Sequence, residues 1–307
     1  MKETVQIVIL SRDRAKYLKE SLDSVLNQNL SKVTIKVTVS DNSEQEEVRE
    51  MIERDYPSHN FEYIRRNPPV PAREHFQLII SECEERYIVM FHDDDIMHPD
   101  YVETMFPFIQ KEGVSAVGCN AFLCKNSISK SKDKAYYFET YKEFDNEKDF
   151  LEQYSPGNGG ITPFPSYMYC TNFLKKISLV SLPGAKYFDV ILLSTMLKYG
   201  LIVWLPDTLM YYRIHDENDS NIEDTVGGIA LLNYIAKKRI GKNQDFFVAM
   251  RYDLWRKWLP KQDKVNLFSW RNRVVFKFLL LRSFYFAGKL FFWRAVFRRI
   301  KIFLRGN

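Results

Sequence analysis

Apolar and polar positions follow two different periods along residues 1–120. Segments rich in apolar and β-branched residues, which predict strands, occur at 5–10, 33–39, 61–64, 87–91 and 114–122. Between these runs, the spacing or composition predicts helices at about 18–26, 44–54, 74–83 and 100–110. Strands that alternate with helices predict a mainly parallel sheet with helices on both faces, an α/β architecture of Rossmann-like type.

The pattern becomes less regular after residue 124. Residues 125–165 show no sustained period, and 155–160 form a glycine-bearing loop that suits either a substrate lid or a plain surface connection. The segment 187–199 reads as a helix that ends at Gly200. Two short strands are then expected, at 202–205 and 209–214.

Polar residues follow three of the predicted strands. They are Ser11, Arg12 and Asp13 after the first strand, Ser40, Asp41 and Asn42 after the second, and His92, Asp93, Asp94 and Asp95 after the fourth. In open α/β sheets, functional groups gather at the carboxyl ends of the strands. We therefore expect these three clusters to converge on one crevice.

Three consecutive aspartates at the end of a buried strand repel one another unless a cation neutralises them. Carboxylate oxygens suit Mg²⁺ or Mn²⁺, and such sites commonly use one or two carboxylates together with substrate phosphates. The alternative is a solvated acidic loop in which Asp95 and Asp100 favour the start of the next helix. The position of the aspartates directly after an apolar strand favours the metal site.

Charge divides the chain into two unequal parts. The formal net charge is +5, but residues 251–307 contain 15 Lys and Arg against two Asp, a net of +13, and the remainder is −8. In this tail the spacing predicts an amphipathic helix, with a basic stripe on one side and large apolar residues on the opposite side. The stripe comprises Arg294, Arg298, Lys301 and Arg305. This pattern is typical of helices that lie on an anionic membrane surface. Packing against the rest of the chain is the alternative, and the absence of any nucleic-acid motif disfavours nucleic acid as the partner.

The cysteine pattern and the apolar segments bear on location. The four cysteines form no Cys-x-x-Cys pair and no disulfide framework, as expected of reduced thiols in the cytosol. No apolar run suggests a secretory signal or a spanning helix. The expected location is cytoplasmic, peripheral on the inner face of the cell membrane.

Four segments resemble, in the right order, the motifs of family 2 glycosyltransferases with the GT-A fold. They are 5–28, 37–43, 91–99 and 211–215 with Ser220 nearby, and the resemblance covers about residues 4–220. The resemblance implies transfer of a sugar from a nucleotide-sugar to an acceptor hydroxyl, with inversion at the anomeric carbon. It divides the chain into a catalytic domain at 1–220 and a helical, basic, membrane-associating region at 221–307.

The resemblance also implies roles for individual residues. Asp41 would contact the base or ribose of the donor, Asp93 the ribose, and Asp94 and Asp95 the metal ion, Mn²⁺ or Mg²⁺. The spacing to Pro99 favours Asp94 as the counterpart of the metal-binding aspartate of the family, so that His92 stands where the family has an aspartate. Which aspartate ligates the ion stays open.

Further donor contacts are expected around this cluster. Ser11 and Arg12 belong to the crevice, and Arg213 and His215 are donors that suit a diphosphate. Arg73 resembles a family position near the donor, although a solvated helix arginine explains it equally well.

An inverting transfer also needs a general base. Asp189 resembles the second acid of a pair that precedes the base-bearing helix of the family, with Phe188 in place of the first. It is also the only carboxylate between Glu152 and Asp207. A helix-terminal aspartate favoured by the helix dipole is the alternative.

A sugar transferase with a membrane-binding tail suggests a UDP- or dTDP-sugar donor and a lipid-linked saccharide acceptor of bacterial surface-polysaccharide synthesis. One rival reading is a nucleotidyltransferase, which the absence of glycine in 10–14 disfavours. The other is a non-catalytic membrane- or nucleic-acid-binding protein on a decayed transferase fold.

Overall fold

The computed structural model describes residues 2–58, 60–124, 133–135, 140–154, 160–215 and 224–237. The chain divides into two compact units. The first consists of residues 1–145, 162–182 and 195–218, and the second consists of 146–161, 183–194 and 219–307. Of the predicted membrane-associating region 221–307, only residues 224–237 are among the described residues.

A mixed β-sheet forms the centre of the first unit. Its strands run in the order β3-β2-β1-β4-β8-β6-β9-β5, and β7 pairs with β9 outside this path. The strands are β1 (Thr4–Ser11), β2 (Thr34–Asp41), β3 (Glu62–Arg65), β4 (Tyr87–His92), β5 (Ile96–Met97), β6 (Val114–Cys124), β7 (Lys142–Phe144), β8 (Tyr167–Cys170) and β9 (Leu201–Arg213).

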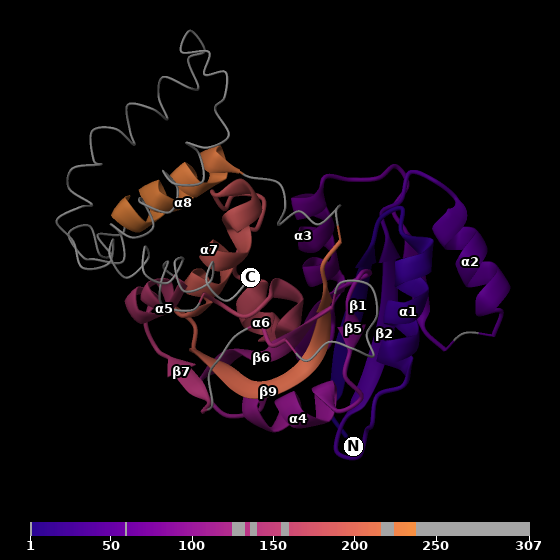
Figure 1. Cartoon of the computed structure of the whole chain (residues 1–307), viewed down its shortest axis with the longest axis horizontal. Coiled ribbons are helices and arrows are strands. Elements are labelled where there is room, and N and C mark those ends of the chain that lie inside the picture. The colour runs from indigo at the N-terminus through magenta and orange to yellow at the C-terminus, as the bar shows by residue number, and fades with distance from the viewer. Residues whose placement is uncertain are drawn as a thin grey trace, which may run out of the picture. The chain divides into compact units, whose positions relative to one another are not determined.

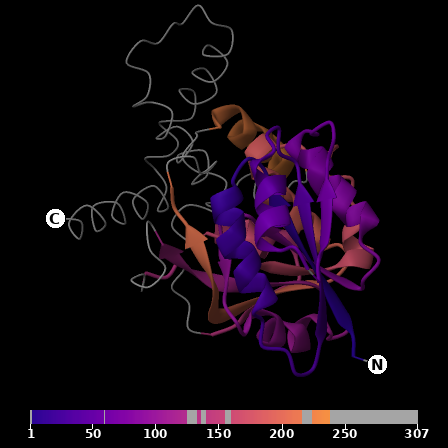
Figure 2. The same ribbon diagram turned by 90° about the vertical axis from the view of Figure 1, so that its right-hand side faces the viewer.

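Helices connect and cover these strands (Figures 1 and 2). In the first unit they are α1 (Ala15–Leu26), α2 (Glu47–Asp55), α3 (Ala72–Glu82), α4 (Tyr101–Ile109), a 3-10 turn at Phe164–Ser166 and α6 (Thr171–Leu174). The α/β architecture with a central sheet flanked by helices is the one predicted, and the GT-A fold class is confirmed.

The N-terminal half of the sheet has a topological switch point between β1 and β4. β1 pairs in parallel with β2 on one side and with β4 on the other, and β3 extends the sheet beyond β2. The chain thus winds outward through β2 and β3 and then returns past β1 to form β4. Ligands of open α/β sheets bind at such a point, beside the carboxyl ends of the strands.

The second half of the sheet differs from the prediction, which missed the short strands β5, β7 and β8 and divided β9. β8 is an antiparallel strand inserted between β4 and β6, and its four residues are too few to give a periodic signal. The two strands expected at 202–205 and 209–214 are one strand, β9. Pro206 and Asp207 do not end it but form an irregularity in its pairing with β6. Proline is tolerated at such bulges, where its missing N–H interrupts no ladder hydrogen bond.

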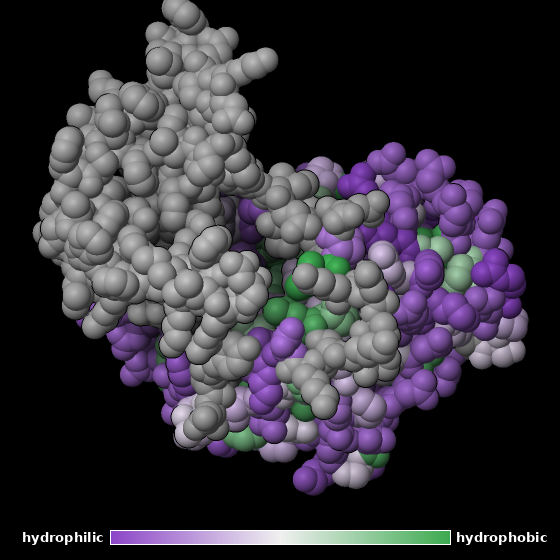
Figure 3. All heavy atoms as spheres, viewed as in Figure 1, coloured by the Kyte–Doolittle hydropathy of each residue, from purple (hydrophilic) through white to green (hydrophobic). Residues whose placement is uncertain are grey.

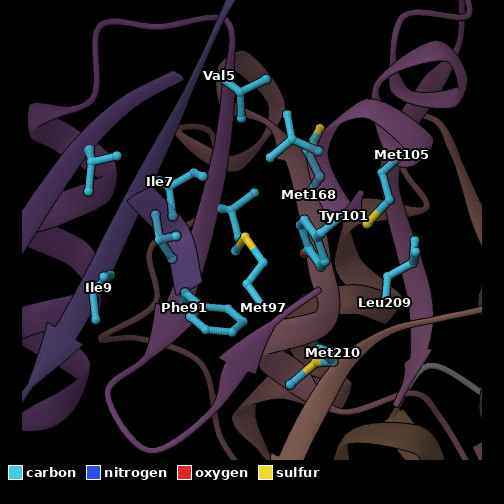
Figure 4. Packing of buried hydrophobic residues seen from close by; sticks show 14 of the residues in the cluster. Val5, Ile7, Ile9, Phe91, Met97, Tyr101, Met105, Met168, Leu209 and Met210 are labelled. Atoms are coloured by element: carbon cyan, nitrogen blue, oxygen red, sulfur yellow. The ribbon is translucent and has the colours of Figure 1, made fainter. Parts of the chain in front are cut away.

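One face of the sheet carries a continuous hydrophobic core. Alternate residues of β1 (Val5, Ile7 and Ile9) point into it and meet apolar residues from α1, α2 and α4. Figure 4 shows ten labelled members: these three together with Phe91, Met97, Tyr101, Met105, Met168, Leu209 and Met210. The outer surface over α2 is mainly hydrophilic (Figure 3), so this amphipathic helix presents only its apolar side to the core.

The second unit contains α5 (Glu147–Tyr154), most of α7 (Phe188–Met196) and α8 (Thr225–Lys237). Asp224 caps α8, since its Oδ1 accepts the backbone N–H of Gly227 at 2.8 Å. Its Oδ2 accepts the N–H of Lys186 at 3.4 Å, in the turn that leads into α7. Within the described part of the chain, no helix is both long and apolar enough to cross a membrane.

A buried polar chain links α3 to the end of β2. His75 is 4% exposed, and its Nε2 lies 2.7 Å from the Ser40 hydroxyl. That hydroxyl also accepts a hydrogen bond from Nε of Arg66 at 3.0 Å. Arg66 is in turn held by both carboxylate oxygens of Glu82, each at 2.6 Å. The chain fixes the strand end that precedes Asp41.

This arrangement predicts an acid-sensitive fold. Burial, reinforced by the positive charge of Arg66, lowers the pKa of His75 to about 4. The unfolded state therefore binds more protons than the native state below the ordinary histidine pKa of about 6.5. Stability is full above that value and falls as the pH drops towards 4, by about 3 kcal/mol from this residue.

Urea unfolding at a series of pH values checks this, with His75→Gln as the comparison. We expect the wild type to lose more free energy of unfolding between pH 6.5 and 4 than the variant does. Equal slopes for the two proteins would show that His75 does not carry the effect.

Candidate functional site

The polar clusters predicted at the ends of β1 and β4 meet at the switch point. The backbone N–H of Arg12 donates to Oδ2 of Asp93 at 3.0 Å, across the two neighbouring strands. Asp13 adopts a left-handed conformation with φ of 55°, which turns the chain sharply after β1. Its Oδ1 accepts the backbone N–H groups of Glu44 and Gln45, at 2.9 and 3.2 Å. The loop after β1 is therefore tied both to β4 and to the loop after β2.

Asp94 has two basic side chains, Arg14 and His215, against a single oxygen. Its Oδ2 lies 3.0 Å from Nη1 of Arg14 and 2.9 Å from Nε2 of His215. Arg14 also lies 3.5 Å from Oδ1 of Asp93. Arg14 precedes α1 and His215 follows β9, so residues 201 positions apart neutralise the same carboxylate.

Arg213 holds the turn that carries Asp94 and Asp95. Its backbone N–H donates to Oδ1 of Asp95 at 3.0 Å, and its Nε donates to the backbone carbonyl of Asp94 at 2.8 Å. Its Nη2 contacts Glu20 at 2.6 Å, and the guanidinium lies over the ring of Tyr17, 4.7 Å from the centroid. With 8% exposure, Arg213 acts here as an internal clamp.

The three aspartates are almost fully buried, with exposures of 3% for Asp93, 6% for Asp94 and 0% for Asp95. Burial, together with the charge of Asp94, raises the pKa of Asp93 to about 7 and the pKa of Asp95 well above its ordinary value. Burial also opposes ionisation of Asp94, but the charges of His92, His215 and Arg14 outweigh it and lower the pKa of Asp94. The negative charge of the cluster is thus concentrated on Asp94 until another cation binds.

A metal ion fits this cluster. His92, Asp94 and Asp95 each offer one ligand atom, and the three atoms lie within 4.8 Å of one another. Oδ2 of Asp95 is buried and has no hydrogen-bond partner within the described residues. A buried carboxylate oxygen left without a donor is unfavourable, and a divalent cation would satisfy it.

Asp41, the predicted base or ribose contact, lies inside the protein with 0% exposure. Its Oδ1 accepts the N–H of Ser43 at 2.9 Å, and its Oδ2 accepts the hydroxyl of Tyr63 at 2.6 Å. Burial, followed by the contact with Asp41, raises the pKa of Tyr63 above its ordinary value. In this conformation Asp41 orders the end of β2 and the ring of Tyr63.

The remaining predicted donor contacts of the first unit, Ser11, Arg12 and Arg73, differ in exposure and in partners. Ser11 is buried at the end of β1, whereas the side chain of Arg12 is 53% exposed and pairs with Glu44 at 2.7 Å. Arg73, in the first turn of α3, donates from Nη1 to the backbone carbonyl of Leu182.

Asp189, the predicted base, belongs to the second unit, in the first turn of α7. Its Oδ1 accepts the N–H of Val190 at 2.8 Å. The residue keeps some exposed surface, yet the burial of its carboxyl raises its pKa to about 6. A carboxyl with such a pKa is suited to taking up a proton near neutral pH.

Sequence reasoning assigned no role to Arg14, Tyr17 or Glu20, and each contacts a residue of the cluster or its clamp. Tyr17 also packs against the His215 ring, with centroids 5.3 Å apart. Their spacing could have indicated a shared role. Residues 14, 17 and 20 are three positions apart, so they lie on one side of α1 and its N-terminal cap.

The comparisons with known proteins agree with this geometry. The family model described as Glycosyl transferase family 2 matches residues 6–164, slightly more than half of the chain. No curated protein matches the sequence.

Two solved structures share the fold. TarS 1-349 from S. aureus in complex with UDP-GlcNAc has a TM-score of 0.54 and 16% sequence identity, covering 76% of this chain and 67% of that one. The mannosyltransferase PcManGT from Pyrobaculum calidifontis, in complex with GDP-Man and Mn²⁺, has a TM-score of 0.55 and 12% identity, covering 98% and 87%. From the match of the family model over 6–164, this chain belongs to glycosyl transferase family 2.

Proposed function

We propose that this glycosyltransferase moves a hexose, with inversion, from a UDP- or dTDP-sugar to a hydroxyl of a lipid-linked saccharide in bacterial surface-polysaccharide synthesis. The observation that carries the donor side of the proposal is the buried carboxylate cluster at the switch point, where one oxygen of Asp95 has no partner in the part of the chain that the structure describes. The nucleotide-sugars bound to TarS and PcManGT support a donor of this class.

Residues of this chain would divide the work of the transfer. Asp189 would take the proton of the acceptor hydroxyl while that oxygen attacks the anomeric carbon. The bond between the anomeric carbon and the diphosphate oxygen breaks, and its electron pair leaves with the nucleoside diphosphate. Ser11, Arg12, Asp41, Asp93 and Arg73 would bind the donor, and Arg213 and His215 would stabilise the charge that develops on the diphosphate.

A divalent ion, Mn²⁺ or Mg²⁺, held by Asp94 and Asp95 would neutralise the same leaving group as a Lewis acid. The basic side chains around Asp94 support this role. Burial opposes the ionisation of this carboxyl, and nearby basic groups lower its pKa, so positive charge favours its ionised form. The Mn²⁺ in the PcManGT complex is a further support for metal dependence.

The acceptor is inferred from the predicted tail. A peripheral position on the inner face of the cell membrane would bring the enzyme to a saccharide that a lipid anchors there. The proposed contact is between the basic stripe of 289–307 and anionic headgroups. Nucleic acid has no part in the proposal.

Donor binding is tested by thermal shift with UDP-, dTDP- and GDP-sugars, each with and without Mn²⁺. We expect one nucleotide class to raise the melting temperature, by more when Mn²⁺ is present. Asp94→Asn should abolish the part of the shift that depends on Mn²⁺, because it removes the ionised carboxylate of the cluster. A variant that keeps the full shift would contradict the metal assignment.

The base is tested by turnover of Asp189→Asn with saturating donor. We expect kcat to fall by about 10²- to 10⁴-fold, the range for loss of a general base. Because the pKa of Asp189 is about 6, wild-type kcat should decline as the pH falls below that value, and the variant should lack this limb. Asp207→Asn is the matched control, since Asp207 is exposed at the β9 irregularity. A variant of Asp189 with wild-type turnover would remove it as the base.

Membrane binding is tested by flotation with anionic liposomes. Replacing Arg294, Arg298, Lys301 and Arg305 by Gln, or deleting 271–307, should release the protein at low salt, since each basic residue near such a surface contributes about 1 kcal/mol. The control replaces four exposed lysines of the first unit by Gln, namely Lys2, Lys16, Lys32 and Lys111. Equal flotation of the tail variants and the wild type would rule out the tail as the anchor.

A further inference from the structure

His92 is the point at which this chain departs from the aspartates of its family. It is the last residue of β4, and its ring nitrogen lies within 4.8 Å of carboxylate oxygens of both Asp94 and Asp95. Among the described residues, this group combines an imidazole with two carboxylates at the distances that a metal ion requires. A neutral imidazole would offer a nitrogen ligand where an aspartate offers oxygen, so it would change which metal ions the site prefers.

Two phenylalanines fix the orientation of the His92 ring. Phe76 on α3 lies 6.3 Å away between ring centroids, and Phe164 lies 5.9 Å away. These two phenyl rings also meet each other edge to face, at 5.4 Å. An imidazole packed in this way loses little further rotational freedom when it ligates an ion, which favours ligation.

The oxygens beside His92 are available for the same ion. Oδ2 of Asp95 is fully buried and has no partner in the described part of the chain. Arg14 and His215 both contact Oδ2 of Asp94, and the carboxylate of Asp94 offers one ligand atom to the group. One ring nitrogen and two carboxylate oxygens thus lie within 4.8 Å of one another, and substrate phosphates or water can complete the shell of an ion held by them.

We propose that His92 is a third ligand of this site and makes it selective for transition-metal ions such as Mn²⁺ and Co²⁺ over Mg²⁺. The proposal rests on the metal site of the proposed function and adds a ligand and a selectivity to it. Mg²⁺ strongly prefers oxygen ligands, whereas imidazole binds first-row transition ions well and binds Co²⁺ more tightly than Mn²⁺. An aspartate at position 92 would instead give an all-oxygen site suited to Mg²⁺.

The direct test is pulsed electron paramagnetic resonance of the full chain loaded with Mn²⁺ and UDP. Electron spin-echo envelope modulation should show coupling to a nitrogen nucleus in the wild type, and this coupling should be lost in His92→Asp. His215→Gln distinguishes the two histidines near Asp94 and should keep the coupling. His98→Gln, six residues further along the chain, is the control for a general effect of removing an imidazole.

Selectivity is measured by isothermal titration of Co²⁺, Mn²⁺ and Mg²⁺ in the presence of UDP. We expect the wild type to bind Co²⁺ at least about tenfold more tightly than Mg²⁺, and His92→Asp to reduce that ratio by about tenfold or more. His98→Gln should leave the ratio unchanged.

The outcomes separate this inference from the proposed function. Mn²⁺ that binds without nitrogen coupling in the wild type, or a coupling that persists in His92→Asp and disappears in His215→Gln, overturns the role of His92 and leaves metal-dependent transfer intact. If no ion binds the wild type with UDP, both the ligand and the metal dependence fail. Sugar transfer that proceeds in a chelator would then identify a metal-independent enzyme.

Discussion

The burial of three adjacent carboxylates at the end of β4 is the constraint on which the rest of the site depends. An ionised carboxylate that leaves water without compensation costs several kcal/mol, and three neighbouring ones also repel one another. The protein meets this cost with positive charge and backbone donors supplied from β1, α1 and β9. One oxygen of Asp95 has no hydrogen-bond partner among the described residues, and it marks where external positive charge would be favourable.

β9 is the element that makes this compensation possible. Its 13 residues pair in parallel with β6, and its end pairs with β5, which directly follows the aspartates. The pairing of Ile96 with Tyr211 sets the register that brings the backbone of Arg213 to Asp95. The irregularity at Pro206 and Asp207 lets one strand serve both partners, because it bends the strand without ending it.

The order of strands and helices in residues 1–120 could be predicted from apolar periodicity, and so could the meeting of polar residues at the switch point. The same reasoning divided β9 at Pro206 and missed β8, because a four-residue strand has too few positions to show alternation. It also proposed Arg213 and His215 as contacts of a diphosphate, which stays a prediction. A one-dimensional pattern cannot show that the guanidinium of Arg213 is already engaged with Glu20, Tyr17 and the Asp94 carbonyl.

The contacts of Asp41 could not be predicted from the sequence either. The position of an aspartate after a strand shows that it lies at the functional edge of the sheet, but its partners depend on Tyr63 of the next strand and on the turn to Ser43. For His92, in contrast, the departure from the family pattern was visible in the sequence. Its nearness to both carboxylates and its contacts with the rings of Phe76 and Phe164 could be found only from the fold.

The location of Arg213 and His215 in the chain has a consequence for the order in which the protein can be made. The segment matched by the family model ends at residue 164 and already contains every aspartate of the cluster. The basic residues Arg213 and His215, which contact the cluster, are synthesised about 50 residues later. A nascent chain of the matched length would lack these contacts, so the site can be completed only late in synthesis, after β9 has joined the sheet.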